Sequence, residues 1–372
     1  MSTLRELTPF FSIPADYSLS SLDRIAENNS LWAIPIREVY GSLNPSPWGT
    51  GREQYVLPEC DLCELRKYVA ACFDRNIEFN YCINLNCAGN IEFCRFGQKS
   101  LADFGRMLVE FGVSRVTATL PSIIETLQRI APELKVTVSV IASIDSVNKL
   151  KYFSAFPNVD RVIICEYLNR RIRALDLLVS HCPRGISVGT IINSLCLIDC
   201  PARSFHYSFG SHAISKTEHY LIHEYYGAKC ALRKIDNPCE FLKMPWIRPE
   251  DLSLYSDLGI SCFKLSGREM RGADWISVVD IYNQGSFYGN AIDLFMGFSD
   301  GPFNKIFFLP NSELGRFTAR FFEDPDLCDP IKCFKCNQCD KYVNLIEIDD
   351  AEKRLWSGTF AKDLQSFIVN SS

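Results

Sequence analysis

Three consecutive segments decide the fold, and they read Arg115-Val-Thr-Ala-Thr-Leu120, Pro121-Ser-Ile-Ile-Glu-Thr-Leu-Gln-Arg-Ile130 and Lys135-Val-Thr-Val-Ser-Val-Ile-Ala142. The first and third are rich in β-branched residues, which is typical of buried strands. The second has apolar residues at helical spacing and begins with proline, which the first position of a helix accepts without losing a hydrogen bond. A strand, a helix and a strand in this order predict parallel pairing through a right-handed crossover.

The same alternation extends in both directions along the chain and predicts roughly eight strands. The predicted strands are residues 31–39, 78–84, 115–120, 135–142, 161–165, 185–192, the start of 246–259, and 262–265. The predicted helices are residues 61–73, 100–111, 121–130, 145–153, 170–180, 218–226, the remainder of 246–259, and 275–282. Eight strands are what a closed barrel needs, so we expect an α/β protein with a TIM-like (β/α)8 barrel. An open doubly wound sheet is the alternative, but the chain has no G-x-G-x-x-G phosphate turn.

The alternation stops near residue 285, where the chain becomes rich in Phe, Gly, Asn and Pro. We therefore expect two regions. Residues 1–284 form the barrel, with an insertion around 193–245 that carries a metal site, and residues 285–372 form a small cysteine-rich C-terminal appendage with a metal site of its own.

Composition excludes several classes of protein. Hydrophobic residues make up 47% of the 372 residues and charged residues 22%, as in soluble globular proteins. The formal charge of -5 argues against a broad basic surface for nucleic acid, although a local basic channel is compatible with it. No apolar run of about 18 residues predicts a transmembrane helix, and the first residues lack the apolar core of a signal peptide. We expect a cytoplasmic protein.

Seventeen cysteines are many for a chain of this length, and an odd number excludes complete intramolecular pairing. In a reducing compartment, clustered cysteines bind metal more often than they form disulfides. Not every cysteine belongs to such a cluster. Cys165 and Cys262 lie in strand-like runs, where a free thiol behaves as a small hydrophobic side chain.

The C-terminal region holds the sharpest local motif, Cys333-x-x-Cys336-x-x-Cys339, with Cys328 a short distance upstream. Gaps of two residues allow a turn to point successive thiolates at the corners of one iron-sulfur cluster, as in bacterial ferredoxins. Zinc also favours Cys-x-x-Cys pairs, so a structural Zn(Cys)4 site is the main competitor. Four ligands fit either centre, and a metal-free set is the third alternative.

A second group of cysteines follows the predicted strand 185–192. Cys196 and Cys200 come directly after it, at the face where barrel enzymes keep their active sites. We expect them to hold iron. Cys230 and Cys239 lie in the insertion and are candidates to complete the set, with Cys87, after the second predicted strand, as an alternative fourth ligand.

Several cationic side chains also lie at predicted strand ends or just beyond them. These candidates are Arg203, His206, Arg248, Lys264 and Arg268. Such a group suits an anionic ligand or developing negative charge. The alternative is that each forms an ordinary salt bridge, and Arg248 has Glu250 and Asp251 within one turn. His219 and His223, four residues apart, are interpreted as surface residues, and no serine-hydrolase elbow or His-Glu-x-x-His helix occurs.

Ordered blocks of this sequence resemble the collagenase-like peptidase family, unclassified peptidase family thirty-two. The blocks are Phe79-Asn-Tyr-Cys-Ile-Asn-Leu-Asn-Cys-Ala-Gly-Asn90, Cys196-Leu-Ile-Asp-Cys-Pro-Ala-Arg-Ser-Phe-His206, Trp246-Ile-Arg-Pro-Glu-Asp-Leu252 and Phe263-Lys-Leu-Ser-Gly-Arg-Glu269. The resemblance spans about residues 78–290. It implies a TIM-like barrel with a cysteine-bound iron-sulfur cluster, in which Cys196 and Cys200 match cluster positions and Cys230 is a third candidate.

The resemblance also implies a type of chemistry. The family name records an old protease assignment, whereas several members act in oxygen-independent hydroxylation of ubiquinone precursors, tRNA or ribosomal RNA, and some are linked to prephenate as oxygen donor. This chain departs from the longer-gap cysteine pattern of the RNA-modifying branch. Together with the acidic balance, that departure favours a small or carrier-linked substrate.

Three hypotheses follow. The first is an iron-sulfur enzyme that performs a redox modification, foremost an oxygen-independent hydroxylation. In it, Cys196, Cys200, Cys230 and Cys239 bind one 4Fe-4S cluster, the four C-terminal cysteines bind a second, and Arg203, His206, Arg248 and Lys264 hold an anionic ligand. The second is a metal-dependent peptidase or other hydrolase. The third is a non-catalytic cluster carrier that serves a partner enzyme, with the C-terminal cysteines as an electron relay and an electron-donor protein as partner.

Overall fold

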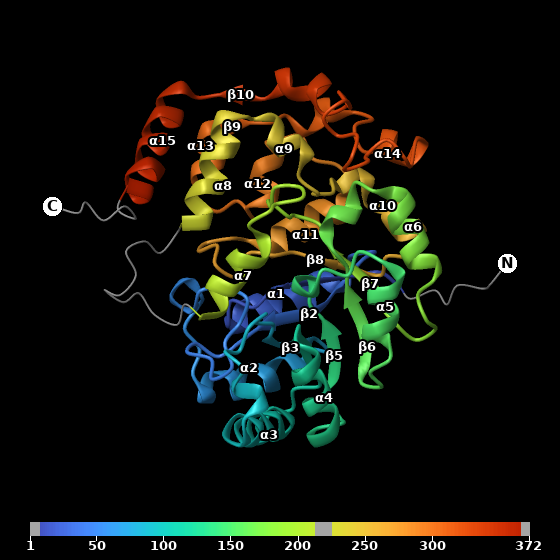
Figure 1. Ribbon diagram of the computed structural model, residues 1–372, viewed down its shortest axis with the longest axis vertical. Coiled ribbons are helices and arrows are strands. Elements are labelled where there is room, and N and C mark those ends of the chain that lie inside the picture. The colour runs from blue at the N-terminus through green and yellow to red at the C-terminus, as the bar shows by residue number, and fades with distance from the viewer. Residues whose placement is uncertain (1–7, 213–224, 366–372) are drawn as a thin grey trace.

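The computed structural model describes residues 8–212 and 225–365. Eight parallel strands close into a barrel in which each strand pairs with the next along the chain, and β1 pairs with β8 (Figure 1). The strands are β1 (Phe10–Pro14), β2 (Ile36–Gly41), β3 (Glu78–Ile83), β4 (Arg115–Ala118), β5 (Lys135–Val138), β6 (Val159–Ile163), β7 (Ser187–Ile191) and β8 (Cys262–Lys264). The predicted TIM-like (β/α)8 barrel is confirmed, and the open sheet is excluded.

The helices surround the barrel and cover one of its ends (Figure 1). They are α1 (Leu19–Asn29), α2 (Leu62–Asp74), α3 (Arg95–Glu110), α4 (Pro121–Ile130), α5 (Val147–Ser154), α6 (Ile172–Ser180), α7 (Arg203–His212), α8 (Tyr225–Asp236), α9 (Cys239–Lys243), α10 (Leu252–Asp257), α11 (Trp275–Gln284), α12 (Ala291–Phe295), α13 (Pro302–Ile306), α14 (Ala319–Glu323) and α15 (Asp350–Gln365). Short 3-10 turns include Val140–Ala142, Glu166–Asn169, Pro249–Asp251 and Asp340–Leu345.

The prediction of the strands was wrong at two places. The N-terminal strand β1 was missed because its five residues follow a polar segment and end at Pro14. The segment at Trp246 is not a strand, because prolines at 245 and 249 each remove a backbone donor. A single backbone hydrogen bond, from Ile247 N to Ile192 O (2.8 Å), ties this segment to the end of β7. The two errors offset each other, so the predicted total of eight was correct.

Helix starts follow local capping chemistry. Pro121 is the first residue of α4, as predicted. Asp61 caps α2: its side chain accepts from Glu64 N (2.8 Å), while the Glu64 side chain accepts from Asp61 N (3.0 Å). Most of the predicted helix 218–226, including His219 and His223, lies outside the described residues.

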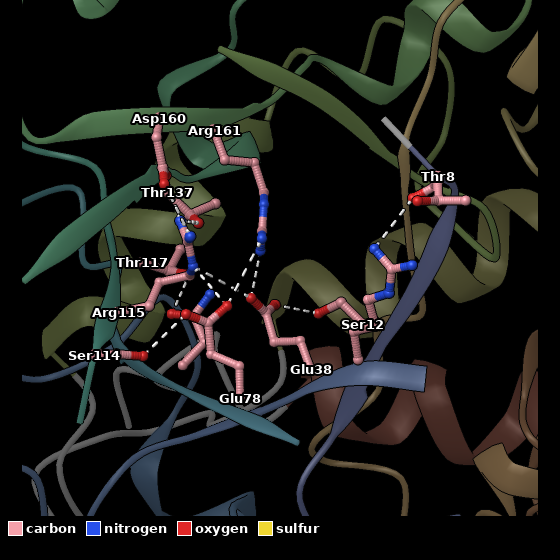
Figure 2. Close-up of polar contacts among 12 residues, drawn as sticks. Thr8, Ser12, Glu38, Glu78, Ser114, Arg115, Thr117, Thr137, Asp160 and Arg161 are labelled. Atoms are coloured by element: carbon pink, nitrogen blue, oxygen red, sulfur yellow. Dashed lines mark hydrogen bonds and ion pairs between the residues drawn. The ribbon is translucent and has the colours of Figure 1, made fainter. Parts of the chain in front are cut away.

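Charged residues fill part of the barrel interior, where TIM barrels usually pack branched apolar side chains (Figure 2). Glu38 on β2 is 1% exposed, pairs with Arg161 on β6, and accepts a hydrogen bond from Ser12 Oγ (2.5 Å). Arg115 on β4 donates through Nε to Glu78 Oε2 (2.8 Å) and through Nη2 to Asp160 Oδ2 (3.0 Å). These five residues, Glu38, Glu78, Arg115, Asp160 and Arg161, are the interior charge network.

A small apolar cluster adjoins this network, since the guanidinium of Arg161 lies 4.7 Å from the centre of the Phe10 ring. Phe10, Ile163, Ile191 and Cys262 form this buried cluster, so Cys262 is a core thiol as predicted. Gly189 on β7 allows the strands to close at this point. A Cβ at residue 189 would lie 2.7 Å from Cys262 Cβ and 2.9 Å from Cys262 O, closer than atoms pack.

The C-terminal region continues the core of the barrel. Trp246 is completely buried and stacks on Phe295 (4.9 Å between ring centroids) and on Phe317 (5.7 Å). A two-stranded antiparallel sheet joins β9 (Phe307–Phe308) to β10 (Glu347–Ile348), and α15 lies beside α8 of the insertion (Figure 1). The appendage and the insertion thus cover the same end of the barrel. In the described residues, we find no helix with the length and apolarity to span a membrane.

Candidate functional site

A pocket of about 290 Å³ opens where the strands end, at the face where TIM barrels place their active sites. Residues on or just after seven of the eight strands line it: Tyr40, Cys82, Thr117, Ser139, Glu166, Asn193 and Lys264. The remaining wall comes from the insertion, through α7 and α8. The pocket therefore joins the barrel to the segment that the cysteine pattern singled out.

Three of the predicted cluster ligands, Cys196, Cys200 and Cys230, line this one pocket. Asn193 fixes the loop that follows β7: its amide nitrogen donates to Ser266 O (2.8 Å), and its oxygen accepts from Ser266 N (2.8 Å). Cys200 N donates to the hydroxyl of Tyr167 (3.2 Å). Burial raises the pKa of Cys196 to about 11, so this thiol is protonated at neutral pH unless a metal displaces the proton.

The fourth predicted ligand lies elsewhere. Cys239 is buried at the start of α9, and its thiol donates to Asp340 Oδ1 (3.2 Å) in the C-terminal region. Neither Cys239 nor the alternative Cys87 lines the pocket. Cys82 on β3, which the sequence reasoning missed, is the other thiol that does so among the described residues.

The predicted ligands Cys328, Cys333, Cys336 and Cys339 lie outside the pocket, in the C-terminal region. In the parts of the chain that the structure describes, no three Cys, His, Asp or Glu side chains converge closely enough to hold a single metal ion. A four-iron cluster spreads its four thiolates over separate corners, so it accepts a wider spacing than one tetrahedral ion does. The pocket holds three of the predicted thiols together with cationic neighbours, so such a cluster would need a fourth ligand.

Arg203, the first residue of α7, lies in the pocket wall as predicted. Its guanidinium donates to Glu166 Oε2 (2.6 Å) and to Ser143 Oγ (3.0 Å), and it lies over the ring of Tyr167 at 5.0 Å. Burial acts to lower the pKa of Arg203, but Glu166 raises it above its usual range, so the side chain stays charged. Much of its charge is already compensated by Glu166.

Lys264 at the end of β8 is the least compensated cation of the pocket. The side chain is 8% exposed, its ammonium lies 3.1 Å from the centre of the Tyr40 ring, and it has no hydrogen-bond partner among the described residues. Burial lowers the pKa of Lys264, while Glu38 acts in the opposite direction. An anion bound in the pocket would supply the missing partner.

His206 also lines the pocket, where its ring stacks on Tyr226 (5.4 Å, 27°). Its Nε2 lies 3.9 Å from Glu53 Oε1, which is too far for a hydrogen bond. Burial, with a smaller contribution from Arg52, lowers the pKa of His206 to about 4. The imidazole is therefore neutral at pH 7. One of its ring nitrogens can donate a hydrogen bond and the other can accept one, but the ring adds no positive charge.

Arg248, the remaining predicted site cation, does not line the pocket. Its guanidinium is 4% exposed and forms two hydrogen bonds with Asp251, Nε to Oδ2 (2.8 Å) and Nη2 to Oδ1 (3.0 Å). It also donates to Gly315 O (2.7 Å). These bonds join the turn before α10 to the C-terminal region, so the alternative interpretation of an ordinary salt bridge was correct.

Sequence reasoning missed a second ion pair in the pocket wall, Arg52 Nε with Glu269 Oε1 (3.2 Å). Both residues could have been found from their positions, because Arg52 follows the predicted strand 31–39 through a glycine-rich loop and Glu269 ends the last resembling block. Glu166 likewise follows the predicted strand 161–165 directly. The strand-end argument was applied to cations and cysteines but not to these carboxylates.

The pocket is electropositive. Its charged wall residues are Arg52, Glu166, Arg203, Lys234, Lys264, Arg268 and Glu269. Both carboxylates are paired with arginines, whereas Lys234, Lys264 and Arg268 lie within 4.0 Å of no carboxylate in the described residues. An anionic ligand therefore fits the pocket better than a neutral or cationic one.

Comparison with known proteins agrees with the fold and with the resembling blocks. No family model matches the chain. The uncharacterized protease MJ1657 of Methanocaldococcus jannaschii is 28% identical over 305 residues, which cover 81% of this chain and 86% of that protein. The solved structure of the U32 peptidase Mk0906 shares the fold, with a TM-score of 0.51 and 16% identity over 72% of this chain and 96% of that one.

The fold and the pocket define a (β/α)8-barrel protein with thiols and cations at the barrel mouth. In sequence the chain is similar to the uncharacterized protease MJ1657, and in fold to the U32 peptidase Mk0906, which agrees with the resemblance of its sequence blocks to the collagenase-like peptidase family. Both similarities support the predicted resemblance. Both relatives carry a protease or peptidase name.

Proposed function

We propose that this protein is an iron-sulfur enzyme that performs a redox modification at the barrel mouth, foremost an oxygen-independent hydroxylation of a small or carrier-linked anionic substrate. The observation that carries the proposal is the meeting of Cys196, Cys200 and Cys230 in one pocket with unpaired cations. These thiols come from two segments about 30 residues apart, so their convergence requires the folded insertion. A bound 4Fe-4S cluster would supply one-electron chemistry there.

The cations define the substrate class. Lys264 and Arg268 lie at the end of β8 and face Tyr40, with the ammonium of Lys264 at 3.1 Å and the guanidinium of Arg268 at 6.0 Å from that ring. Two neighbouring cations without carboxylate partners suit a carboxylate or phosphate group. Prephenate, a dicarboxylate that the family resemblance links to oxygen donation, has this chemistry and is the proposed co-substrate.

His206 and Tyr207 complete the proposed polar wall. The neutral imidazole of His206 can share a proton with a substrate hydroxyl, and burial raises the pKa of Tyr207 above its usual range, so that its phenol remains a donor. In this arrangement Lys264 orients the bound anion, and His206 forms a hydrogen bond with a hydroxyl group of the substrate. Both contacts lie inside the pocket.

The names of the two relatives favour a second candidate, a metal-dependent hydrolase. Such an enzyme would activate water at a bound metal and need a free carboxylate as base. The two pocket carboxylates, Glu166 and Glu269, are both held by arginines. That pairing makes the redox proposal the better supported of the two.

Anaerobic purification of the full chain tests the cofactor. The proposal predicts a brown protein with iron, sulfide and a broad visible absorbance that fades on reduction. Cys196→Ala should remove about four iron atoms per chain, the content of one cluster, whereas Cys63→Ala, at an exposed thiol on α2, should remove none. Iron loss that is equal in the two variants, or a colourless protein holding only zinc, contradicts the proposal. Peptide hydrolysis under the same conditions would support the hydrolase instead.

A further inference from the structure

A second cavity lies beside the pocket, at the same end of the barrel. Its volume is about 530 Å³, and its walls are the end of β1, the loop that follows β2 and the loop that follows β8. These three strands are neighbours in the barrel. Within the described structure, the end of β1 is the one strand end that contributes no residue to the pocket. The mouth of the barrel thus holds two adjoining cavities, which together use the ends of all eight strands.

The loop after β8 forms the boundary between the two cavities, because Gly267, Arg268 and Met270 line both of them. Gly267 has a φ of +127°, and a Cβ at this residue would overlap the ring of Trp275 and lie 2.9 Å from Met270 Sδ. A residue with a side chain therefore does not fit at this position. As a result, the boundary carries no side chain at Gly267.

Arg268 supplies a cation at this boundary. The residue is only 9% exposed, its Nη1 donates to Ser42 Oγ (3.2 Å), and its guanidinium lies 6.0 Å from the centre of the Tyr40 ring. Unlike Arg52 and Arg203, it has no carboxylate within 4.0 Å in the part of the chain that the structure describes. The guanidinium can therefore bind an anionic group of a ligand that touches both cavities.

The two cavities differ in charge. The pocket is electropositive, whereas the second cavity has Asp16 and Glu59 in its wall besides Arg268 and Arg271, so its formal charges balance. Asp16, Glu59 and Arg271 are all exposed. Asp16 is also engaged in its own loop, where Oδ1 accepts a hydrogen bond from Ser18 N (2.9 Å). We therefore expect the group that the second cavity binds to be uncharged.

The buried wall of the second cavity is apolar and firmly held. Its buried apolar residues are Pro14, Ala15, Leu57 and Trp275, and Val56 is half-buried beside them. The side chain of Asn44 fixes the turn at this wall, because its amide nitrogen donates to Gln54 O (3.0 Å) and to Leu57 O (3.0 Å). A concave apolar wall that is formed before binding suits an apolar group and lowers the cost of ordering on binding.

We propose that the two cavities form one binding site for an amphipathic acid, with the acid group at Lys264 and Arg268 and an uncharged apolar chain in the second cavity. Charge complementarity supports this assignment, since the unpaired cations lie in the pocket and at the boundary, and the apolar wall lies beyond them. The proposal deepens the proposed function by giving its anionic substrate an apolar chain. It rests on that function only for the binding of an anion in the pocket, and it needs neither the cluster nor the hydroxylation.

Isothermal titration calorimetry of butyrate, hexanoate and octanoate with the full-length, anaerobically purified protein tests the proposal. Burial of one methylene group strengthens binding by about fourfold, so Kd should fall by about that factor for each methylene that enters the second cavity. Octan-1-ol has the same chain without the acid group and should bind at least about tenfold more weakly than octanoate. Equal affinities for the three acids, or no detectable binding of octanoate, would overturn the proposal.

A matched pair of variants tests where the chain binds. Val56→Glu places a charge in the second cavity, and Val147→Glu makes the same change at a half-buried valine at the start of α5, outside both cavities. Val56→Glu should weaken octanoate binding by about tenfold or more. It should leave butyrate within about twofold, which also reports an intact pocket, and Val147→Glu should change neither. Equal loss of octanoate binding in the two variants, or equal loss of both acids in Val56→Glu, would show that the chain does not bind there.

Arg268→Met tests the position of the acid group. Because this variant removes a charged partner of the acid, butyrate and octanoate should both bind more weakly, by the same factor of about tenfold or more. Unchanged affinity for both acids, or a loss confined to octanoate, would refute the assignment of the acid group to Arg268. The iron content of the same preparation reports separately on the redox proposal, so failure of that proposal and failure of this one are distinguishable.

Discussion

Replacement of Glu38 by glutamine tests whether the interior charge network holds the barrel together. Glu38 is 1% exposed and faces Arg161, Arg115 and Lys264. Burial alone would raise the pKa of Glu38, but these three cations and the hydroxyl of Ser12 lower it from 4.5 to about 2. Each pKa unit corresponds to about 1.4 kcal/mol, so the charged state of Glu38 contributes about 3 kcal/mol to the free energy of unfolding at pH 7.

Removal of one partner from a buried ion pair gives a similar figure, about 3 to 5 kcal/mol, because the cations left behind remain charged. We therefore expect Glu38→Gln to lower the free energy of unfolding at pH 7 by about 3 kcal/mol or more. The sign of the pH dependence follows from the lowered pKa. The contribution is complete above about pH 4.5 and is lost as the pH falls toward 2, so the difference between the two proteins should narrow over that interval.

The assay is urea unfolding followed by circular dichroism between pH 7 and pH 3. Glu125→Gln is the matched control, because Glu125 pairs with Arg129 on the surface of α4, where both side chains are more than half exposed. That change should cost less than about 1 kcal/mol. Equal losses in Glu38→Gln and Glu125→Gln, or a difference that widens as the pH falls, would refute the reasoning. The double variant Glu38→Gln with Arg161→Met should recover part of the loss, since it removes an unpaired charge.

Three further predictions concern the pocket and its supports. Lys264→Met should weaken prephenate binding, measured by isothermal titration calorimetry, by about tenfold or more, because one charged hydrogen bond contributes about 1.5 to 3 kcal/mol; unchanged affinity would remove Lys264 from the site. Arg248→Ala should cost about 3 to 5 kcal/mol of stability by leaving Asp251 buried and unpaired, yet leave that affinity within twofold; a selective loss of binding would return Arg248 to the site. Gly189→Ala should destabilise the barrel by about 1 to 3 kcal/mol in the same urea assay, because its Cβ meets backbone and side chain of Cys262; an unaltered midpoint would mean that the strands can shift apart.

The barrel could be predicted from the sequence because alternating strands and helices produce a regular alternation of two patterns of apolar residues. The segments that begin at Pro121 and Lys135 show the helical and the strand pattern clearly. The charged interior could not be predicted in the same way. In β2, Glu38 follows the exposed Arg37, and a charged residue in a strand is normally interpreted as exposed to solvent. Only closure of the barrel turns this side chain inward and brings Glu38 to Arg161, 123 residues later.

Position at a strand end predicted much of the pocket, including Arg203, His206 and Lys264. The same rule failed for Arg248, because a residue after a strand can point into the barrel mouth or outward to the helix layer, and the distinction depends on Asp251 and on the distant Gly315. It failed also for Cys239. Which thiols lie close together depends on the path of the chain through the insertion, and that path cannot be predicted from any local sequence pattern.

The interior charge network also bears on how the barrel responds to heat. The cost of taking charged groups out of water falls as temperature rises, whereas stabilisation by apolar contacts reaches a plateau. Because Glu38, Arg115 and Arg161 are almost completely buried, added salt screens their attraction very little. A barrel held partly by such pairs gains relative strength on warming. The relative contribution of the interior charge network to the stability of the barrel should therefore grow as the temperature rises.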